Sequence, residues 1–183
     1  MTAKLKLYIF LLVLGLVVIG GGVWMIIQSP PEIEIPEGNP VIYEQVDHFM
    51  RGEFEYLYIY DDGSIIYIEE KGLRPSGGNP TRTWKTGKIG QQQLDSLLAY
   101  LENSQLEKLE DHYIYSGEQK SDMQFTITVN SDNLSQTVSA LGYPVLDNGE
   151  AYPDMPAPLN EIYKRLKTIS GVTEQVYQEA IRD

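Results

Sequence analysis

The stretch that decides the fold is Phe54–Glu70, which reads FEYLYIYDDGSIIYIEE. Two runs of β-branched and aromatic residues flank Asp61-Asp62-Gly63, and an Asp-Gly turn between such runs is a strong hairpin signal. We therefore expect strands over residues 54–60 and 64–70. One apolar face is expected to hold Leu57, Ile59, Ile66 and Ile68, and the other face Tyr56, Tyr58, Tyr60 and Tyr67 with Phe54 and Ile65.

The residues after the hairpin predict a loop, a strand and a helix. Residues 71–82 contain five glycines or prolines and are expected to form a loop, followed by a short strand over 83–89. Four leucines then recur at positions i, i+3, i+4 and i+7 within Gln91–Asn103. This spacing places the leucines on one face of a helix, which predicts an amphipathic helix over these residues.

The C-terminal third predicts a second strand pair and further helices. Residues 122–130 alternate apolar and polar side chains, and a Ser-Asp-Asn turn leads to a second strand over 134–141. An irregular loop over 142–158 precedes a helix at Leu159–Ile169, which Gly171 is expected to end. We expect Thr173–Ile181 to form a short final helix. Antiparallel strands with one-sided helices predict a two-layer α+β domain.

The N-terminal region predicts a membrane anchor. Leu7–Ile27 contains no charged residue, and a helix of this length spans about 31 Å, close to the hydrocarbon core of a bilayer. Lys4 and Lys6 precede it, so the positive-inside rule places the N-terminus in the cytoplasm. The expected order is a cytoplasmic stub at 1–6, a transmembrane helix at 7–27, a Pro/Glu-rich stalk at 28–40 and an extracytoplasmic domain at 41–183.

A cleaved signal peptide is the alternative to a retained anchor. Gly20 and Gly22 are small residues of the kind found at a cleavage site. Val23–Ile27 nevertheless stays apolar beyond them, which favours a retained helix.

The charge of the chain excludes one class of partner. It has 14 Lys and Arg against 26 Asp and Glu, and Lys4 and Lys6 are the charged residues of positions 1–27. Residues 28–183 thus carry 12 cations and 26 acids, a net charge of −14. A field of that sign repels nucleic-acid phosphates, so we expect no DNA or RNA binding. The absence of cysteine excludes disulfides, thiolate metal sites and a cysteine nucleophile.

The order of motifs resembles a known kind of domain. The segments in question read YDDGSIIY, WKTGKI, QQQLDSLLAYLENS, DHY, SDMQFTITV and PLNEIYKRL. Together they resemble small secreted or membrane-anchored bacterial domains of unknown function, over roughly residues 54–169. The resemblance implies the α+β fold and a location in the cell envelope, and it implies no activity and no catalytic residues.

The sequence contains no recognisable catalytic or metal motif. No G-x-S-x-G occurs, and His48 and His112 lack the H-E-x-x-H spacing of a zinc site. Neither Asp61-Asp62-Gly63 nor Ser131-Asp132-Asn133 reproduces a calcium loop. We therefore predict no catalytic residue, metal or cofactor, and we expect both histidines to be non-catalytic.

Two features suggest surfaces for a partner. Five cations and no acid occur between Lys71 and Gly90, beside a tryptophan, and a positive edge there would attract an acidic partner or lipid headgroups. Its residues are Lys71, Arg74, Arg82, Trp84, Lys85 and Lys88. The second feature is the aromatic face of Tyr56, Tyr58, Tyr60 and Tyr67, a composition enriched at interfaces. The alternative is that helices cover this face.

These observations predict a non-enzymatic, single-pass ectodomain that binds another envelope protein or an anionic surface. Two alternatives stay open at this point. The first is an envelope hydrolase that uses acidic residues, and the second is a sensor domain for a small ligand or a metal.

Overall fold

The structure, a computed structural model of the chain, describes residues 33–73, 79–104, 106–115, 123–142 and 155–181. The mixed α+β class is confirmed, with eight strands in one sheet and two α-helices in the described part. The strands are β1 (Ile42–His48), β2 (Glu53–Ile59), β3 (Ser64–Lys71), β4 (Thr81–Lys88), β5 (His112–Ile114), β6 (Met123–Asn130), β7 (Ser135–Leu141) and β8 (Glu174–Ala180). The helices are α2 (Gln91–Asn103), the 3-10 turn η1 (Leu106–Lys108) and α3 (Ala157–Ser170).

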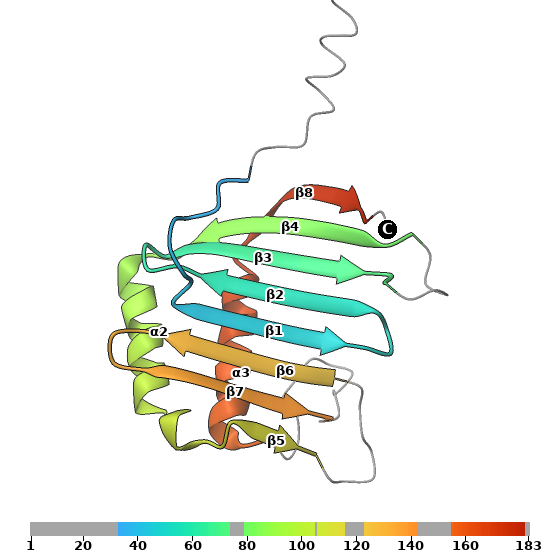
Figure 1. Cartoon of the computed structure of the whole chain (residues 1–183). Helices are drawn as coiled ribbons and strands as arrows, with labels where there is room; N and C mark the ends of the chain where they lie inside the picture. Colours follow the sequence, from blue (N-terminus) through green and yellow to red (C-terminus); the bar gives the residue numbers. More distant parts are fainter. Residues whose placement is uncertain (1–32, 74–78, 105, 116–122, 143–154, 182–183) are drawn as a thin grey trace, which may run out of the picture. The chain divides into compact units, whose positions relative to one another are not determined.

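The strands lie side by side in the order β5-β7-β6-β1-β2-β3-β4-β8 (Figure 1). Neighbours run antiparallel, except that the short edge strand β5 pairs with β7 in parallel. Strand β1 therefore lies in the middle, between the hairpin β2–β3 and the pair β6–β7.

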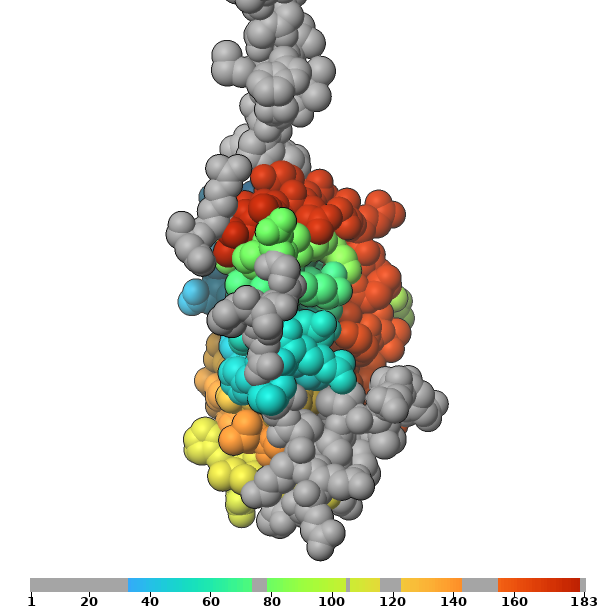
Figure 2. Space-filling model, turned by 90° about the vertical axis from the view of Figure 1, so that its right-hand side faces the viewer, coloured from blue at the N-terminus to red at the C-terminus, as the bar shows by residue number. Residues whose placement is uncertain are grey.

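Both helices pack on the same face of the sheet. In Figure 1 they lie behind the strands, and in the end-on view of Figure 2 the red residues of α3 lie along the right-hand side. Alternate residues of the central strands, such as Leu57 and Phe125, meet the leucine stripe of α2 and the apolar stripe of α3 in one buried core. The side chains between them point to the opposite face, which we call the helix-free face.

The register of the hairpin corrects the predicted faces. Tyr60 pairs with Ser64 around a three-residue turn, so odd-numbered residues of β2 pair with odd-numbered residues of β3. Leu57 lies opposite Tyr67, and Tyr58 lies opposite Ile66. The prediction that Leu57 and Ile59 share a face with Ile66 and Ile68 is therefore wrong, because β3 presents the opposite set of side chains to the core.

The predicted C-terminal helix is also wrong. Residues 174–180 form β8, which pairs with β4 through Arg82–Glu179 and Trp84–Tyr177. An isolated helix of this length is marginal in water, whereas the free edge of β4 offers a row of backbone hydrogen-bond partners. Tertiary pairing has thus overridden the local preference.

No helix in the described ranges is long and apolar enough to cross a membrane. The predicted anchor at residues 7–27 and the first five residues of the predicted stalk, 28–32, lie outside those ranges, whereas residues 33–40 of the stalk are described and form neither helix nor strand.

Candidate functional site

The helix-free face carries three parallel rows of side chains that cross the strands. The tyrosine row consists of Thr128, Tyr43, Tyr58, Ile66 and Thr86. The tryptophan row consists of Thr126, Gln45, Tyr56, Ile68, Trp84 and Tyr177. The charged row consists of Gln124, Asp47, Phe54, Glu70, Arg82 and Glu179.

The first two rows form a second apolar cluster, separate from the core under the helices. Ile66 and Ile68 are buried at its centre, and Tyr56, Tyr58 and Trp84 pack half-buried against them. The rings of Tyr43 and Tyr58 stack with centroids 5.0 Å apart. Half-buried aromatic rings around a small apolar centre are characteristic of protein interfaces.

The charged row is net negative. The row has one cation, Arg82, against three carboxylates, those of Asp47, Glu70 and Glu179. Both Nε and Nη2 of Arg82 lie 2.6 Å from Oε1 of Glu70, and Nη1 lies 3.6 Å from Glu179. Arg82 is therefore engaged by two acids of the domain itself.

The predicted basic edge does not assemble as one surface. Because side chains alternate along β4, Arg82, Trp84 and Lys88 point to the helix-free face while Lys85 points to the helix side. The described cations also lie beside acids of the domain: Lys71 and Lys85 beside Glu69, Lys88 beside Asp62 and Arg82 beside Glu70. Arg74 lies outside the described residues. These pairings neutralise the segment where it stands, so we do not place the partner there.

The two ion pairs of β4 on this face are expected to differ strongly in their effect on stability. Glu70 is 9% exposed, so Arg82→Met leaves a buried carboxylate without its cation and should lower the free energy of unfolding by about 2 kcal/mol. The side chains of Lys88 and Asp62 are 63% and 51% exposed, and Lys88→Met should change the free energy of unfolding by less than about 1 kcal/mol. Urea unfolding of both variants tests this; equal losses would contradict the ranking.

The structure keeps three of the four predicted tyrosines together. Tyr56, Tyr58 and Tyr60 belong to the helix-free cluster, and Tyr43 and Trp84 join them. Tyr67 lies on the other face, in the core under the helices. The alternative that the helices cover these tyrosines is therefore wrong for Tyr56, Tyr58 and Tyr60 and right for Tyr67.

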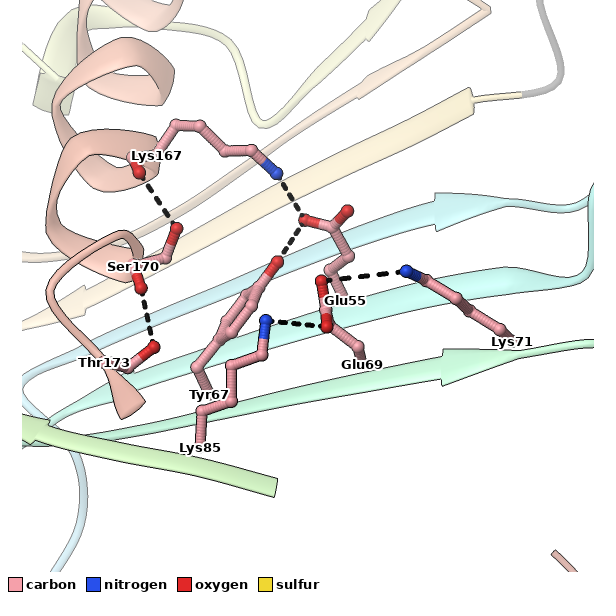
Figure 3. A network of polar contacts seen from close by, with 8 residues as sticks. All are labelled: Glu55, Tyr67, Glu69, Lys71, Lys85, Lys167, Ser170 and Thr173. Carbon is pink, nitrogen blue, oxygen red and sulfur yellow. Dashed lines mark hydrogen bonds and ion pairs between the residues drawn. The ribbon is translucent and has the colours of Figure 1, made fainter. Parts of the chain in front are cut away.

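A polar network that sequence reasoning missed lies on the helix side, near the end of α3 (Figure 3). Lys167 of α3 and the Tyr67 hydroxyl both donate to Oε2 of Glu55, at 2.8 and 2.6 Å. Lys85 lies 2.7 Å from Glu69 and 5.1 Å from the centroid of the Tyr67 ring. The network ties α3 to β2, β3 and β4.

Glu44 of β1 lies close enough to this network to interact with it electrostatically. Its side chain is buried on the helix side, and its Oε1 has no hydrogen-bond partner in the described part of the structure. Burial raises the pKa of Glu44 to about 8, and the negative charge of Glu55 adds to the rise. Burial also opposes ionisation of Glu55, but the charge of Lys167 and the hydrogen bonds from Lys167 and Tyr67 together outweigh it and lower the pKa of Glu55.

Opposite shifts in neighbouring carboxyls can separate acid and base roles in an enzyme. Here Glu44 is only 5% exposed, and Glu55 is already bonded to Lys167 and Tyr67. Glu44 is therefore enclosed in the core, and Glu55, whose side chain is 24% exposed, holds α3 to the sheet through Lys167.

The two histidines lie far apart in the sheet. His48 ends the central strand β1, and His112 begins the edge strand β5. Nδ1 of His112 lies 2.6 Å from the Ser139 hydroxyl at an exposed position, while Asp111 accepts a hydrogen bond from Gln136. A histidine and a serine thus meet without an acid seen to orient the imidazole. Within the described ranges, no group of three His, Asp or Glu residues could hold a metal.

An open groove of about 680 Å³ runs between α2 and α3 on the far side of the helix layer. Its lining includes Gln92, Gln93, Lys164 and Thr168, together with the pair Glu161–Arg165, which is 3.4 Å apart. This lining has two cations, Lys164 and Arg165, against one acid, Glu161, whereas the charged row on the helix-free face has an excess of carboxylates.

No protein-family model matches this chain. No curated protein is significantly similar to it.

Proposed function

We propose that the chain is a membrane-anchored, non-enzymatic binding module of the cell envelope, with residues 28–183 outside the cytoplasm. Its partner, another envelope protein, binds the helix-free face. The single observation behind this proposal is the aromatic cluster of Tyr43, Tyr56, Tyr58 and Trp84, which lies on the face that the helices leave uncovered. Large aromatic side chains at the centre of a patch supply most of the binding energy of typical interfaces.

The rim of this patch fits the same role. Hydrophilic side chains surround the aromatic rings, with the charged row along one side and Thr126 and Thr128 of β6 beyond Tyr43 and Gln45. An aromatic centre with a polar rim is the usual anatomy of a non-obligate interface. A module of this kind needs no catalytic group, which agrees with the buried position of Glu44.

One experiment tests both the location and the face. Because the chain has no cysteine, Thr128→Cys on the helix-free face and Thr168→Cys on α3 each give a single thiol. Both variants are labelled in intact cells with a membrane-impermeant maleimide that carries a photo-crosslinker. We expect both thiols to be labelled. The yield of a specific crosslink to an envelope protein should be at least about tenfold higher from position 128 than from position 168.

The outcomes separate the two parts of the proposal. If neither thiol is labelled until the membrane is broken, the domain is not outside the cytoplasm. If both thiols are labelled and the same protein crosslinks mainly from position 168, the groove between the helices is the binding surface and the helix-free face is not. The identified protein must then bind the purified chain in detergent.

An envelope hydrolase is the second candidate, and the observation that favours it is the pair Glu44 and Glu55 with pKa values shifted in opposite directions. Glu44→Gln would abolish such an activity, whereas a binding module would keep its affinity for its partner.

A further inference from the structure

We propose that the segment of the partner that contacts the helix-free face is a basic, extended polypeptide, whose Lys or Arg side chains bind along the charged row, first at Asp47. This inference rests on the proposed function and specifies the chemistry of the partner.

Asp47 is a buried carboxyl group without a nearby cation of its own row. It is 4% exposed, and its two oxygens accept hydrogen bonds of 3.0 and 2.8 Å from Nε2 of Gln45, a neutral donor. Arg82 is three strands away, which is about 14 Å, and is already bonded to Glu70. A carboxylate held in this way favours an added cation, because a charge-assisted hydrogen bond is stronger than one from an amide.

The hydrogen-bond chain along β1 fixes the position of this carboxylate. The Tyr43 hydroxyl donates to Oε1 of Gln45 at 2.6 Å, and this leaves the amide nitrogen of Gln45 to hold Asp47. The side chain of Asp47 is therefore ordered before a partner binds, and because it is 4% exposed, a cation of the partner reaches its carboxylate when the groups that cover it move aside.

The aromatic rings beside Asp47 suit the same partner. Tyr43 and Tyr58 are stacked, and Tyr56 lies between Gln45 and Ile68 in the neighbouring row. Burial raises the pKa of Tyr56 to about 12, the charges of Glu70 and Asp47 act in the same direction, and the charge of Arg82 opposes them. Tyrosine rings attract Lys and Arg cations through their π faces.

Charge complementarity selects a basic partner over the alternatives. Residues 28–183 carry a net charge of −14, and the cations of β4 on this face are engaged by the domain's own acids. An acidic protein or an anionic lipid surface would therefore be repelled. The sequence alone predicted an acidic partner for this segment. Because its cations are paired with acids of the domain, the expected partner is instead positively charged.

The spacing of the row indicates an extended polypeptide. In the strand order β1-β2-β3-β4-β8, the three carboxylates lie on every second strand: Asp47 on β1, Glu70 on β3 and Glu179 on β8. Asp47 and Glu70 are therefore two strands apart, which is about 9.6 Å. In a polyproline II segment, residues three positions apart point the same way and are separated by about 9.3 Å. A segment with a cation at every third residue would thus match the first two carboxylates.

The test uses the full chain in detergent with Trp24→Phe, which leaves Trp84 as the one tryptophan and as a reporter on the face itself. The probe is a proline-rich peptide with lysine at every third position, compared with the same peptide carrying glutamine instead. We expect the lysine peptide to change Trp84 fluorescence saturably and to bind more weakly as salt rises. Asp47→Asn should weaken its binding about tenfold or more.

Matched variants distinguish the contribution of the Asp47 charge from that of the Tyr56 ring and from a loss of folding. Asp95→Asn removes one charge from the exposed surface of α2 and should leave the affinity unchanged. Tyr56→Phe should keep the affinity because the ring stays, whereas Tyr56→Leu should lose it. Thermal unfolding of each variant confirms that the domain is folded.

Three results would overturn the inference. The glutamine peptide could bind as well as the lysine peptide, or Asp47→Asn could behave like Asp95→Asn. Phosphatidylcholine vesicles could compete through Asp47 as well as the peptide does, which would assign the face to a lipid headgroup instead of a polypeptide. If a partner crosslinks from position 128 while no lysine peptide binds, the proposed function stands and only the basic chemistry of the partner is rejected.

Discussion

The free energy of unfolding of this domain is expected to fall by about 3 kcal/mol between pH 5 and pH 7.5, because Glu44 must stay protonated in the core. Burial raises its pKa from 4.5 to about 8 in the folded state. A raised folded pKa gives stability that is fully present below pH 4.5 and is lost as the pH rises towards 8. Urea unfolding followed by circular dichroism at several pH values measures this slope.

Glu44→Gln should remove most of that slope, because glutamine cannot ionise. Glu107→Gln, at an exposed position of η1, changes the total charge equally and should leave the slope as it is. The amide of glutamine also needs an acceptor in the core, so the variant gains less than the full 3 kcal/mol at pH 7.5. If Glu44→Gln and the parent chain lose stability in parallel, Glu44 is ionised in the folded domain and the argument fails.

Glu55 is expected to lower the free energy of unfolding at acidic pH. Its folded pKa is lowered by Lys167 and by the hydrogen bonds it accepts, so the stability it provides is present above its ordinary pKa of 4.5 and is lost as the pH falls below it. The two carboxyls together place the maximum of stability on the acidic side of neutrality. This maximum depends on both residues, because either carboxyl alone would change the free energy of unfolding in one direction only as the pH rises.

Apolar periodicity and turn residues predicted those elements whose structure is specified by residues close together in the sequence. The leucine spacing of α2 gives the observed bounds, Gln91–Asn103. The alternation over residues 122–130 matches β6, Met123–Asn130, and residue 122 lies outside the described part. The hairpin β2–β3 follows from its Asp-Gly turn. In each case the apolar period and the turn residues indicate the same structure, so no long-range contact is needed to choose between alternatives.

Long-range pairing decided what the sequence could not. Strand β1 was not predicted, because Glu44 occupies a core position and Asp47 is buried on the opposite face, which hides the alternation of Ile42 and Val46. Strand β8 was predicted as a helix, because its identity depends on the free edge of β4, about 90 residues earlier in the chain. Both strands matter for the site, since β1 provides Asp47 and β8 provides Glu179.

The sequence predicted the aromatic part of the candidate site, and it predicted neither the sign of its charge nor its arrangement. Tyr56, Tyr58 and Tyr60 lie together as expected, since one strand fixes their alternation. The cations of residues 71–88 read as a positive segment in the sequence, whereas the pairing of β4 with β3 and β8 brings Glu69, Glu70 and Glu179 beside them. A run of like charges on a strand therefore says little about the sign of a surface until its neighbours are known.

Gly63→Ala is expected to lower the free energy of unfolding by about 3–5 kcal/mol, the largest loss from a single methyl group that we expect in this domain. Gly63 has φ +81°, where an alanine costs about 1–2 kcal/mol. Its Cβ would also overlap the backbone carbonyl oxygen of Ile89, which cannot move as a flexible side chain can. Gly63 and Ile89 are already bonded, since Ile89 N–H donates to the Gly63 carbonyl at 3.0 Å.

Gly38 provides the matched control. It has φ +92°, and a Cβ there would meet nothing within 4 Å, so Gly38→Ala should cost only the conformational term of about 1 kcal/mol. The difference between the two variants isolates the contact with Ile89, which joins the hairpin turn to the segment two residues before α2. Because that turn sets which side chains of β2 and β3 face the helices, Gly63→Ala should also weaken binding at the aromatic cluster. Equal losses of stability in the two glycine variants would show that this contact does not hold the turn in place.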